Sequence, residues 1–485
     1  MSRAIVWFRR DLRLADNPAL AAALNAHATV LPVYVHAPDE EAPWQPGAAS
    51  RWWLHHSLTS LDADLRARGA ALHVRRGETL AALRALAAES GASAVYWNRL
   101  YEPALVARDS RIKEALRADG IDAQSFNAAL LFEPWDIATG QQTPYKVFTP
   151  FWRAARARLD VRQPLRAPRA IEPPRIGGGL AIGALQLLPT IAWDTGFDTW
   201  KPGEAGARKA LDRFLEGALG DYADRRDIPS DRGTSRLSPH LHFGEISPMQ
   251  AVASLEAASH GSAKLRADAE AYLRELGWRE FSHHLLFHFP QSAERNLDPT
   301  FDAFPWTRIG AARLARWKRG RTGIPIVDAG MRELWTTGWM HNRVRMLVAS
   351  FLTKNLRQHW LTGARWFWDT LVDADLANNT QGWQWTAGSG ADAAPYFRIF
   401  NPVTQGQRFD PDGNYVRRWV PELAGFEGKA IHAPWTDPGR LRASGYPTPM
   451  VALDASREAA LAAYRSCKAP GNPHVDSRRT QKQRR

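Results

Sequence analysis

Short apolar runs alternate with longer amphipathic stretches in the first 130 residues, and this alternation limits the fold more than any other feature of the chain. Candidate strands cover residues 4–8, 29–35, 71–74, 92–97 and 121–126. Amphipathic stretches such as 50–68 and 78–89 separate them and have the length of helices. Strands joined by helices run parallel, because a helical crossover returns the chain to the same end of the sheet. We therefore predict an α/β domain over residues 1–130 with a doubly wound parallel sheet.

The predicted sheet is Rossmann-like in its order of elements, but it lacks a nucleotide fingerprint. No G-x-G-x-x-G follows the first strand, and G-x-x-x-x-G-K-[ST] occurs nowhere in the chain. These glycine patterns let the backbone approach a phosphate, so their absence disfavours an NAD-binding or P-loop enzyme. Asp16, Asn17 and Pro18 follow the first strand and predict a helix start, with a capping side chain before a proline that needs no amide partner.

The rest of the chain divides into three segments. Residues 131–202 are predicted to be an interdomain linker, because proline and glycine accumulate in RQPLRAPRAIEPPRIGGGL. Residues 203–470 predict an all-helical domain. Helical periodicity is clearest over 203–216, 263–288, 325–337 and 343–355. Residues 471–485 form a short basic tail ending in DSRRTQKQRR, which is typical of a solvated terminus.

Cysteine content and the N-terminal sequence indicate a cellular compartment. Cys467 is the single cysteine among 485 residues, so the chain cannot form an intrachain disulfide or a thiolate metal cluster by itself. This favours a reducing compartment. The start, MSRAIVWFRRDLRL, has too short an apolar run for a signal peptide, and no window approaches the roughly 20 apolar residues of a membrane span. We expect a cytoplasmic protein with no membrane partner.

Charge and tryptophan content depart from the average. Lys plus Arg number 63 against 50 Asp plus Glu, a net charge of +13. This excess favours a polyanionic partner, because binding to basic side chains releases counterions. The chain has 21 tryptophans, and ten of them lie between Trp278 and Trp385. Such clustering indicates a role beyond filling a core, although packing is the ordinary role of any single tryptophan.

The segment GTSRLSPH concentrates hydroxyl groups at a predicted helix start. Thr234, Ser235 and Ser238 could converge with backbone amides on a phosphate. The same pattern fits a helix N-cap that follows a flexible turn. The residues alone leave both interpretations open.

A second polar group lies on the helix predicted over 263–288. Four of its side chains fall at spacings of three and four: Tyr272, Glu275, Trp278 and Arg279. They share one face, which suits the wall of a polar pocket but also an exposed face with a Glu275–Arg279 ion pair. His284 and His288 stand one turn apart, yet no third ligand is in view, so we expect no metal site.

Two further polar clusters follow along the chain. GWMHNRVRM contains Asn342, Arg343, Arg345 and Met346. These side chains could line a pocket, or the arginines could extend along the surface from a helix start. DTLVDADLANNTQGWQW contains Asp373, Asp375 and Asn379. The carboxylates could bind a metal, but the neighbouring arginines favour ion pairs with Arg345 or Arg279.

Long runs of the chain are specific enough to compare with known families. They are TSRLSPHLHFGEIS, WREFSHH, TGIPIVDAGMREL, GWMHNRVRM and NNTQGWQWTAGSGADAAPYFRIFNP. They resemble, run after run, the photolyase and cryptochrome family, and most closely its bacterial cyclobutane pyrimidine dimer photolyases. The likeness extends from VWFRRDLRLADNPAL to about residue 425, which is nearly the whole chain. It implies that the helical domain binds FAD and that the α/β domain binds a light-harvesting antenna.

The resemblance implies a bent FAD that is active as FADH⁻. The residues at the family's cofactor positions are Tyr222, Thr234, Ser235, Leu237, Ser238, Arg279, Asn342, Arg345, Asp373, Asp375 and Asn379. The first five would hold the phosphates and ribityl chain, while Arg345 and Asp373 would form an ion pair beside the flavin ring. Asn379 would face flavin N5. A neutral amide there suits a fully reduced anion, whereas the aspartate of plant cryptochromes favours a protonated radical.

The tryptophans acquire a role from the same resemblance. Trp383, Trp360 and Trp306 match the family's electron-transfer chain, which leads from the flavin to the surface. Short hops between polarisable rings are faster than one long jump through aliphatic packing. Trp306 precedes Trp317 by 11 positions, one more than in the family pattern, so an insertion must be absorbed near Trp306.

The resemblance also implies a substrate site. The residues at the lesion-contacting positions are Glu275, Trp278, Asn342, Arg343, Met346 and Trp385. Glu275 would hydrogen-bond the thymine edges, Trp278 and Trp385 would pack against the flipped bases, and Met346 would make an apolar contact. Flipping a poorly stacked dimer costs less than flipping an intact pair. The implied reaction is light-driven ring splitting by an electron from FADH⁻, with Glu275, Asn379 and the relay tryptophans as the catalytic set.

Several further properties follow from the family alone. The antenna would be methenyltetrahydrofolate or 8-hydroxy-deazaflavin, with Glu102 in the region that contacts it. The partner would be DNA containing cyclobutane pyrimidine dimers, bound without sequence preference, and we expect a monomer. Two alternatives stay open. One is a cryptochrome-type blue-light photoreceptor, and the other is a photolyase for the six-four photoproduct, which has histidines where this chain has Asn342 and Met346.

Overall fold

Five parallel strands form the N-terminal sheet of the computed structural model, which describes residues 2–393 and 397–469. The strand order is β3-β2-β1-β4-β5. The strands are β1 (Arg3–Phe8), β2 (Thr29–His36), β3 (His73–Arg76), β4 (Ala94–Asn98) and β5 (Asp122–Phe126). Every predicted strand is present, with small shifts at its ends, so the prediction of a doubly wound α/β domain is confirmed.

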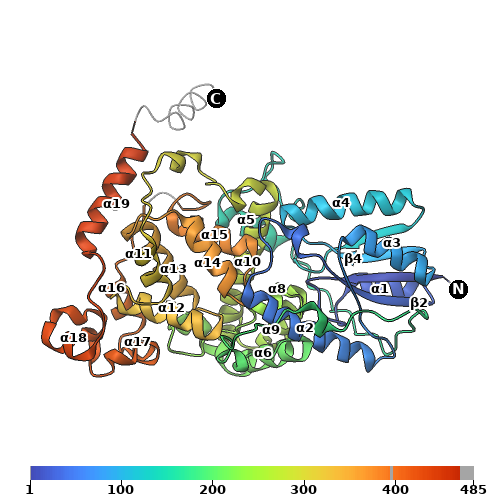
Figure 1. Cartoon of the computed structure of the whole chain (residues 1–485), viewed down its shortest axis with the longest axis horizontal. Coiled ribbons are helices and arrows are strands. Elements are labelled where there is room, and N and C mark those ends of the chain that lie inside the picture. The colour runs from blue at the N-terminus through green and yellow to red at the C-terminus, as the bar shows by residue number, and fades with distance from the viewer. Residues whose placement is uncertain (1, 394–396, 470–485) are drawn as a thin grey trace. The chain divides into compact units, whose positions relative to one another are not determined.

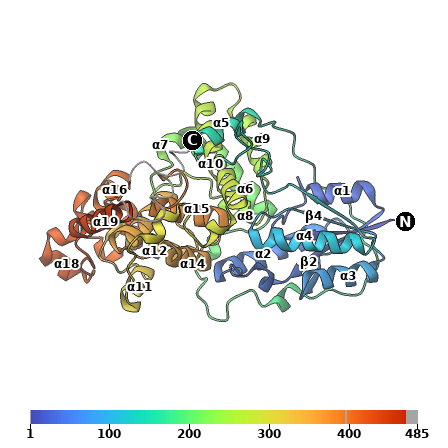
Figure 2. The same cartoon turned by 90° about the horizontal axis from the view of Figure 1, so that it is seen from above.

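Helices cover both faces of this sheet. They are α1 (Pro18–Ala26), α2 (Ala48–Arg66), α3 (Thr79–Ser90) and α4 (Pro103–Ala118). The chain runs outward from β1 to β3 and then crosses back to β4 and β5, so right-handed crossovers put helices on opposite faces. Figure 2 shows α1 on one side of the strands and α3 and α4 on the other. As predicted, Asn17 caps α1 by accepting the N–H of Leu20.

The sheet is buried on both sides, which explains why its strands are almost continuously apolar. Ile5 and Trp7 belong to one core cluster with Leu83 of α3. Val6 and Phe8 are buried as well. Successive side chains of a strand alternate between its faces, so both sets need a covering layer. β1 is the central strand and pairs with β2 and β4.

A helix that the sequence analysis did not anticipate lies within residues 131–202. It is α5 (Phe148–Ala157), in which Phe148, Phe151 and Trp152 are buried. Phe148 stacks on Trp278 of α10 with ring centroids 3.6 Å apart. The apolar residues of α5 are spaced three and four apart, which is the pattern of an amphipathic helix, but their proline-rich neighbours obscured it. This part of the predicted linker therefore packs on a helix.

The described residues after 203 form helices and no strand, which confirms the predicted all-helical region. The first helices of this region are α6 (Glu204–Glu216), α7 (Tyr222–Arg225), α8 (Ser238–His242), α9 (Pro248–Ser259) and α10 (Ala263–His288). The next are α11 (Ala311–Lys318), α12 (Pro325–Thr337), α13 (Asn342–Ser350), the π-helix η7 (Phe351–Asn355), α14 (Trp360–Thr370) and α15 (Leu376–Ala387). The last are α16 (Pro402–Phe409), α17 (Asn414–Trp419), α18 (Pro438–Ser444) and α19 (Leu453–Cys467).

The chain folds into two compact units, and neither is continuous in sequence. The first unit comprises Met1–Ala223, Thr234–Pro290 and Val372–Asp375. The second comprises Asp224–Gly233, Gln291–Leu371 and the described residues from Leu376 onward. The second unit includes α12, α13 and α14, which Figure 1 labels. The domain boundaries expected at residues 130, 202 and 470 stay predictions, and the basic tail lies outside the described residues. In the described part of the chain, no helix has the length and apolar character needed to cross a bilayer.

Candidate functional site

The predicted cofactor and substrate residues divide between the two units. The first unit contains Tyr222, Thr234, Ser235, Leu237, Ser238, Glu275, Trp278, Arg279, Asp373 and Asp375. The second unit contains Trp306, Asn342, Arg343, Arg345, Met346, Trp360, Asn379, Trp383 and Trp385. Arg345 and Asp373 belong to different units, so their ion pair stays a prediction.

The hydroxyl segment of the first unit forms a tight turn before α8. Ser235 accepts the N–H of Leu237 at 3.3 Å and shares a hydrogen bond of 2.8 Å with the phenol of Tyr272. Arg236 has a φ of 54°, a left-handed conformation that tightens the turn. No side chain caps α8. The hydroxyls are therefore not used as an N-cap, which was the alternative that the sequence left open.

Tyr272 connects this turn to an aromatic cluster. Its ring centroid lies 5.3 Å from that of Tyr222 and 4.6 Å from that of Phe214. Burial raises the pKa of Tyr272 to about 12, so the phenol keeps its proton at neutral pH. Tyr222 and Ser235, both predicted to contact the cofactor, thus both contact the same tyrosine.

The face of α10 carries the predicted lesion contacts Glu275 and Trp278, and both are half-buried. One side of the Trp278 indole is covered by α5. Arg279 donates to the carbonyl oxygen of Ala129 at 2.7 Å and lies 3.4 Å from a carboxylate oxygen of Glu280. The sequence suggested an ion pair between Glu275 and Arg279, but the ion pair that the structure gives Arg279 is with Glu280.

Asp375 lies beside two histidines of the first unit. Its Oδ2 is 3.5 Å from Nδ1 of His242 and 3.4 Å from Nε2 of His283, and all three residues are buried. The other ring nitrogen of His283, Nδ1, lies 2.9 Å from the carbonyl oxygen of Arg279. A carbonyl and a carboxylate can only accept hydrogen bonds. Both nitrogens of His283 therefore face acceptors while Asp375 is ionised, an arrangement that favours the positively charged ring.

The charges of this cluster shift its pKa values. Burial by itself lowers the pKa of His283, but Asp375 raises it above the ordinary value. Burial opposes ionisation of Asp375, yet His283 and His242 hold its pKa well below the usual range. We expected Arg345 or Arg279 beside Asp373 and Asp375, and neither histidine was anticipated.

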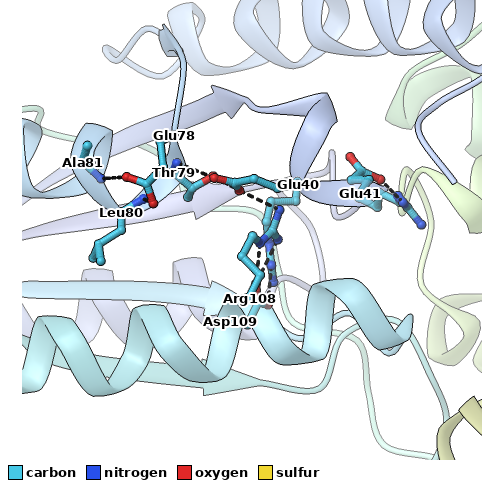
Figure 3. A network of polar contacts seen from close by, with 10 residues as sticks. Glu40, Glu41, Glu78, Thr79, Leu80, Ala81, Arg108 and Asp109 are labelled. Carbon is cyan, nitrogen blue, oxygen red and sulfur yellow. Dashed lines mark hydrogen bonds and ion pairs between the residues drawn. The ribbon is translucent and has the colours of Figure 1, made fainter. Parts of the chain in front are cut away.

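Charged residues also occupy the carboxyl edge of the sheet near β1 and β4, the neighbouring strands between which the strand order reverses. Arg10 lies two residues after the end of β1 and pairs with Glu102 and, at 2.6 Å, with Glu41. Figure 3 shows Glu41 and, close by, Glu40 reaching Arg108. Burial opposes ionisation of Glu102, but Arg10 lowers its pKa. Ligands of open α/β sheets bind at such a switch point, so this edge is the candidate place for a second ligand.

Arg343 of the second unit is held by neighbours from other segments. It pairs with Asp227 at 2.5 Å, and its guanidinium carbon lies 4.4 Å from the ring centroid of Phe409. Its Nη1 is 4.0 Å from the sulfur of Met346. Asn342, the first residue of α13, is exposed. Three predicted lesion contacts thus lie together at one end of α13.

Asn379 on α15 is buried, and the orientation of its amide is fixed. Its Nδ2 donates to the carbonyl oxygen of Ala364 at 2.9 Å. A carbonyl can only accept, so the group facing Ala364 must be the NH₂ group. The Oδ1 of Asn379 is therefore the atom that can accept a hydrogen bond from a bound molecule.

The three relay tryptophans lie in the second unit, and the last of them is the most exposed. Trp383 and Trp360 are buried, whereas Trp306 is half-buried. Trp383 packs on α14 at Gly363, where an added Cβ would lie 2.1 Å from the indole. The ring centroid of His359 is 5.5 Å from that of Trp360 and 5.1 Å from that of Trp306. An imidazole that the sequence analysis missed therefore contacts two members of the relay.

His284 and His288, which stand one turn apart on α10, share a backbone acceptor. His284 and His288 both lie within hydrogen-bond distance of the carbonyl oxygen of Pro134. Among residues 2–393 and 397–469, no group of three or more His, Cys, Asp or Glu side chains is arranged to hold a metal ion.

Four residues that contact predicted site residues were missed by sequence reasoning: Asp227, His242, His283 and His359. No local pattern marks the first three, because their partners are distant in sequence. Asp227 and Arg343, for example, are 116 positions apart. The sequence offered one signal for these residues, which was their type: each is an imidazole or a carboxylate within or near a conspicuous motif.

Two family descriptions match the chain. "DNA photolyase" matches residues 4–170, and "FAD binding domain of DNA photolyase" matches residues 272–466. The first covers the whole sheet, and the second covers most of the helical region.

Individual relatives match the chain over nearly its full length. The deoxyribodipyrimidine photo-lyase of Agrobacterium fabrum is 48% identical, over 96% of this chain and 98% of its own. Cryptochrome-1 of Arabidopsis thaliana is 41% identical, over 94% of this chain and 69% of its own. A crystal structure of a bacterial class III photolyase from Agrobacterium tumefaciens, 46% identical, has a TM-score of 0.92 and covers 96% of this chain and 98% of that one. The chain therefore belongs to the photolyase and cryptochrome family.

Proposed function

We propose that the chain is a light-driven DNA photolyase that splits cyclobutane pyrimidine dimers with the help of FAD. The buried amide of Asn379 carries this proposal. Its Nδ2 donates a hydrogen bond to the carbonyl oxygen of Ala364, and its neutral Oδ1 can accept a hydrogen bond from N5–H of a reduced flavin. An aspartate at this position would impose a charge instead. When bound, FAD in its excited reduced form, FADH⁻, supplies the electron that opens the cyclobutane ring and takes it back.

The residues present fit this cofactor. The turn around Ser235 supplies hydroxyl and amide groups for the phosphates and ribityl chain, through Tyr222, Thr234, Ser235, Leu237 and Ser238. The flavin ring would be lined by Arg279, Asn342, Arg345, Asp373, Asp375 and Asn379. Because His283 is positively charged, Asp375 stays ionised and can accept a hydrogen bond from the cofactor.

The proposed substrate is a dimer flipped out of DNA. Trp278 and Trp385 would pack against its rings, and the guanidinium carbon of Arg398 lies 5.7 Å from the Trp385 ring centroid. Glu275 would accept hydrogen bonds from the thymine N–H groups. Met346 would contact the lesion apolarly and Asn342 through its amide, while Arg343 would bind a phosphate. Histidines that would protonate a six-four photoproduct are replaced here by Asn342 and Met346.

The α/β domain would bind an antenna pigment, either methenyltetrahydrofolate or 8-hydroxy-deazaflavin. Support comes from Glu102, which lies in the charged carboxyl edge of the sheet. The protein would act in the cytoplasm as a monomer on damaged DNA. An absorption spectrum of the purified protein distinguishes the two pigments and reports the redox state of the flavin.

Illumination of the purified, reduced protein with dimer-containing DNA tests the repair proposal. We expect intact thymines to be restored under blue or near-ultraviolet light and not in the dark. Glu275→Ala should lower the repair yield roughly tenfold, because a hydrogen bond to a charged group contributes about 1.5–3 kcal/mol.

Glu270→Ala is the matched control for that experiment. Glu270 is an exposed carboxylate on the same helix and pairs with Arg156. We expect it to repair as the unaltered protein does. Equal losses in both variants, or no restoration by the unaltered protein, would contradict the proposal.

A second candidate function is that of a photoreceptor, which the identity to cryptochrome-1 favours. It predicts a protein whose flavin is photoreduced but which does not prefer damaged DNA.

A further inference from the structure

The indole of Trp360 is held by a chain of two hydrogen bonds. Trp360 is fully buried, and its Nε1–H donates to Oδ1 of Asn296 at 2.9 Å. The Nδ2 of Asn296 donates in turn to Oδ1 of Asp302 at 2.7 Å. An indole N–H can only donate and an ionised carboxylate can only accept. The orientation of the amide between them is therefore fixed from both sides.

The loop that carries Asn296 is tied to α15 and to the residues just beyond it. The N–H of Leu297 donates to the side-chain oxygen of Gln384 at 2.8 Å, and Gln384 is fully buried. The N–H of Asp298 donates to the carbonyl oxygen of Ser389 at 2.8 Å. These bonds immediately after Asn296 keep its amide against Trp360.

A tryptophan that loses an electron changes its acid–base chemistry. The indole N–H of a neutral tryptophan is a very weak acid, whereas that of the radical cation is a far stronger one, because the positive ring holds its proton less tightly. A carboxylate or a neutral imidazole at hydrogen-bond distance would take this proton. The neutral radical left behind oxidises a neighbouring ring poorly. An amide oxygen accepts the hydrogen bond but is far too weak a base to take the proton.

We propose that Asn296 is a positioning residue of the electron relay, which stabilises the oxidised Trp360 ring without removing its proton. The inference rests on the proposed binding of FAD and on the tryptophan relay that the family resemblance implies, in which photoexcited oxidised FAD is the oxidant and Trp383 its first donor. Trp360 gives one electron to Trp383 and receives one from Trp306. No N–H bond breaks at Trp360, so the positive charge passes on to Trp306.

The surroundings of the relay favour a positive charge that can move. Asp302 is exposed, so its negative charge reaches Trp360 only through Asn296 and is screened by water. His359 lies against both Trp360 and Trp306, and its Nδ1 accepts the backbone N–H two residues further on. Burial lowers the pKa of His359, so the ring is neutral at pH 7. A neutral ring does not repel an oxidised neighbour.

Asn296→Asp is made together with Asp302→Asn, because two carboxylates at this distance would share a proton. This pair, called Asn296→Asp below, places a base on the indole N–H with little change in size. Transient absorption after flash excitation of the oxidised holoprotein distinguishes a tryptophan radical cation from a neutral radical by their spectra. In the unaltered protein we expect the cation, followed by charge transfer to Trp306. In Asn296→Asp we expect the neutral radical and an about tenfold lower yield of oxidised Trp306, because a bound proton must return before the charge can move.

Asn355→Asp is the matched control. Asn355 is 8% exposed, as Asn296 is, and it donates to Ser456 rather than facing a tryptophan. This variant should leave the radical spectra unchanged, and thermal unfolding reports whether both variants fold. A second measurement, made in the dark, tests the hydrogen bond between Trp360 and Asn296 directly. The Trp360 indole N–H, observed by NMR in the holoprotein, should exchange with solvent faster in Asn296→Leu, which offers no acceptor.

The outcomes separate the role of Asn296 from the relay itself, and repair by the pre-reduced protein tests the proposed function independently of both. If Trp360→Phe photoreduces its flavin as fast as the unaltered protein, no relay runs through Trp360 and the inference fails with it. If Trp360→Phe blocks photoreduction while Asn296→Asp still forms the radical cation and oxidises Trp306, the relay stands. In that case the role assigned to Asn296 is overturned.

Discussion

Asp375 stays ionised in a buried setting because two imidazoles lie against it. A buried carboxylate without a partner would take up a proton instead. The arginine-rich motifs nearby suggested a guanidinium, but the contacts are with His242 and His283. Both nitrogens of His283 face acceptors, an arrangement that favours its positive charge. The charge of this cluster therefore responds to pH in a range where an arginine would not.

Removal of this imidazolium should lower stability in a pH-dependent way. The pKa of His283 is raised above its ordinary 6.5, so its contribution is fully present below pH 6.5 and is lost as the pH rises through the raised value. His283→Asn should lower the free energy of unfolding by about 3 kcal/mol near pH 6, the usual cost of breaking a buried ion pair. The loss should be smaller near pH 9. Chemical denaturation at both pH values measures the difference.

Two variants of the same helix complete this test. His283→Arg keeps the positive charge and should restore most of the stability. His288→Asn changes a histidine whose contact is with Pro134, so it should show no such pH dependence. A loss in His283→Asn that is the same at both pH values would mean that His283 contributes packing alone.

At the scale of elements, strong start and stop signals made helix bounds predictable. The predicted bounds of α10 and α12 agree with the structure at both ends. Ser262 caps α10, and Gly338 ends α12 in a left-handed conformation. α5 was not anticipated, because its flanks are rich in proline and its apolar face is only ten residues long. A short helix is stabilised mainly by the surface on which it packs.

The contact between α14 and Trp383 depends on the lack of a side chain at Gly363. An added Cβ would lie 2.1 Å from the indole, and a rigid ring cannot bend away. Gly363→Ala should therefore lower the free energy of unfolding by about 1–3 kcal/mol, the range found for overpacked cores. Denaturant unfolding followed by tryptophan fluorescence measures this loss.

Gly382→Ala is the control for this packing prediction. Gly382 is an exposed residue of α15 that directly precedes Trp383, and a Cβ there would meet no atom within 4 Å. Alanine restricts the unfolded chain more than glycine does, so this variant should gain about 0.5–1 kcal/mol. If both alanine variants had the same effect, close packing at Gly363 would not be the cause.

At the scale of the whole molecule, the net charge of +13 predicts a salt-sensitive attraction to DNA. Arg343 should contribute one phosphate contact, in competition with its pairing to Asp227. Arg343→Ala should therefore reduce the slope of log affinity against log salt concentration by about one. Arg84→Ala, which removes an exposed guanidinium on α3 that pairs with Asp119, should leave the slope unchanged. Equal slopes for all three proteins would remove Arg343 from the DNA interface.

Local patterns were enough for the fold class, the strands and the long helices, because these depend on backbone preferences and side-chain spacing over neighbouring residues, which a single sequence displays. The family resemblance named the residues at the cofactor and lesion positions, and those roles stay predictions. The partners of those residues came from packing. His283 beside Asp375 and Asn296 beside Trp360 are contacts between distant segments, the latter 64 positions apart. The partner of a buried charge or amide is decided only when such segments pack together, because no local rule relates their side chains.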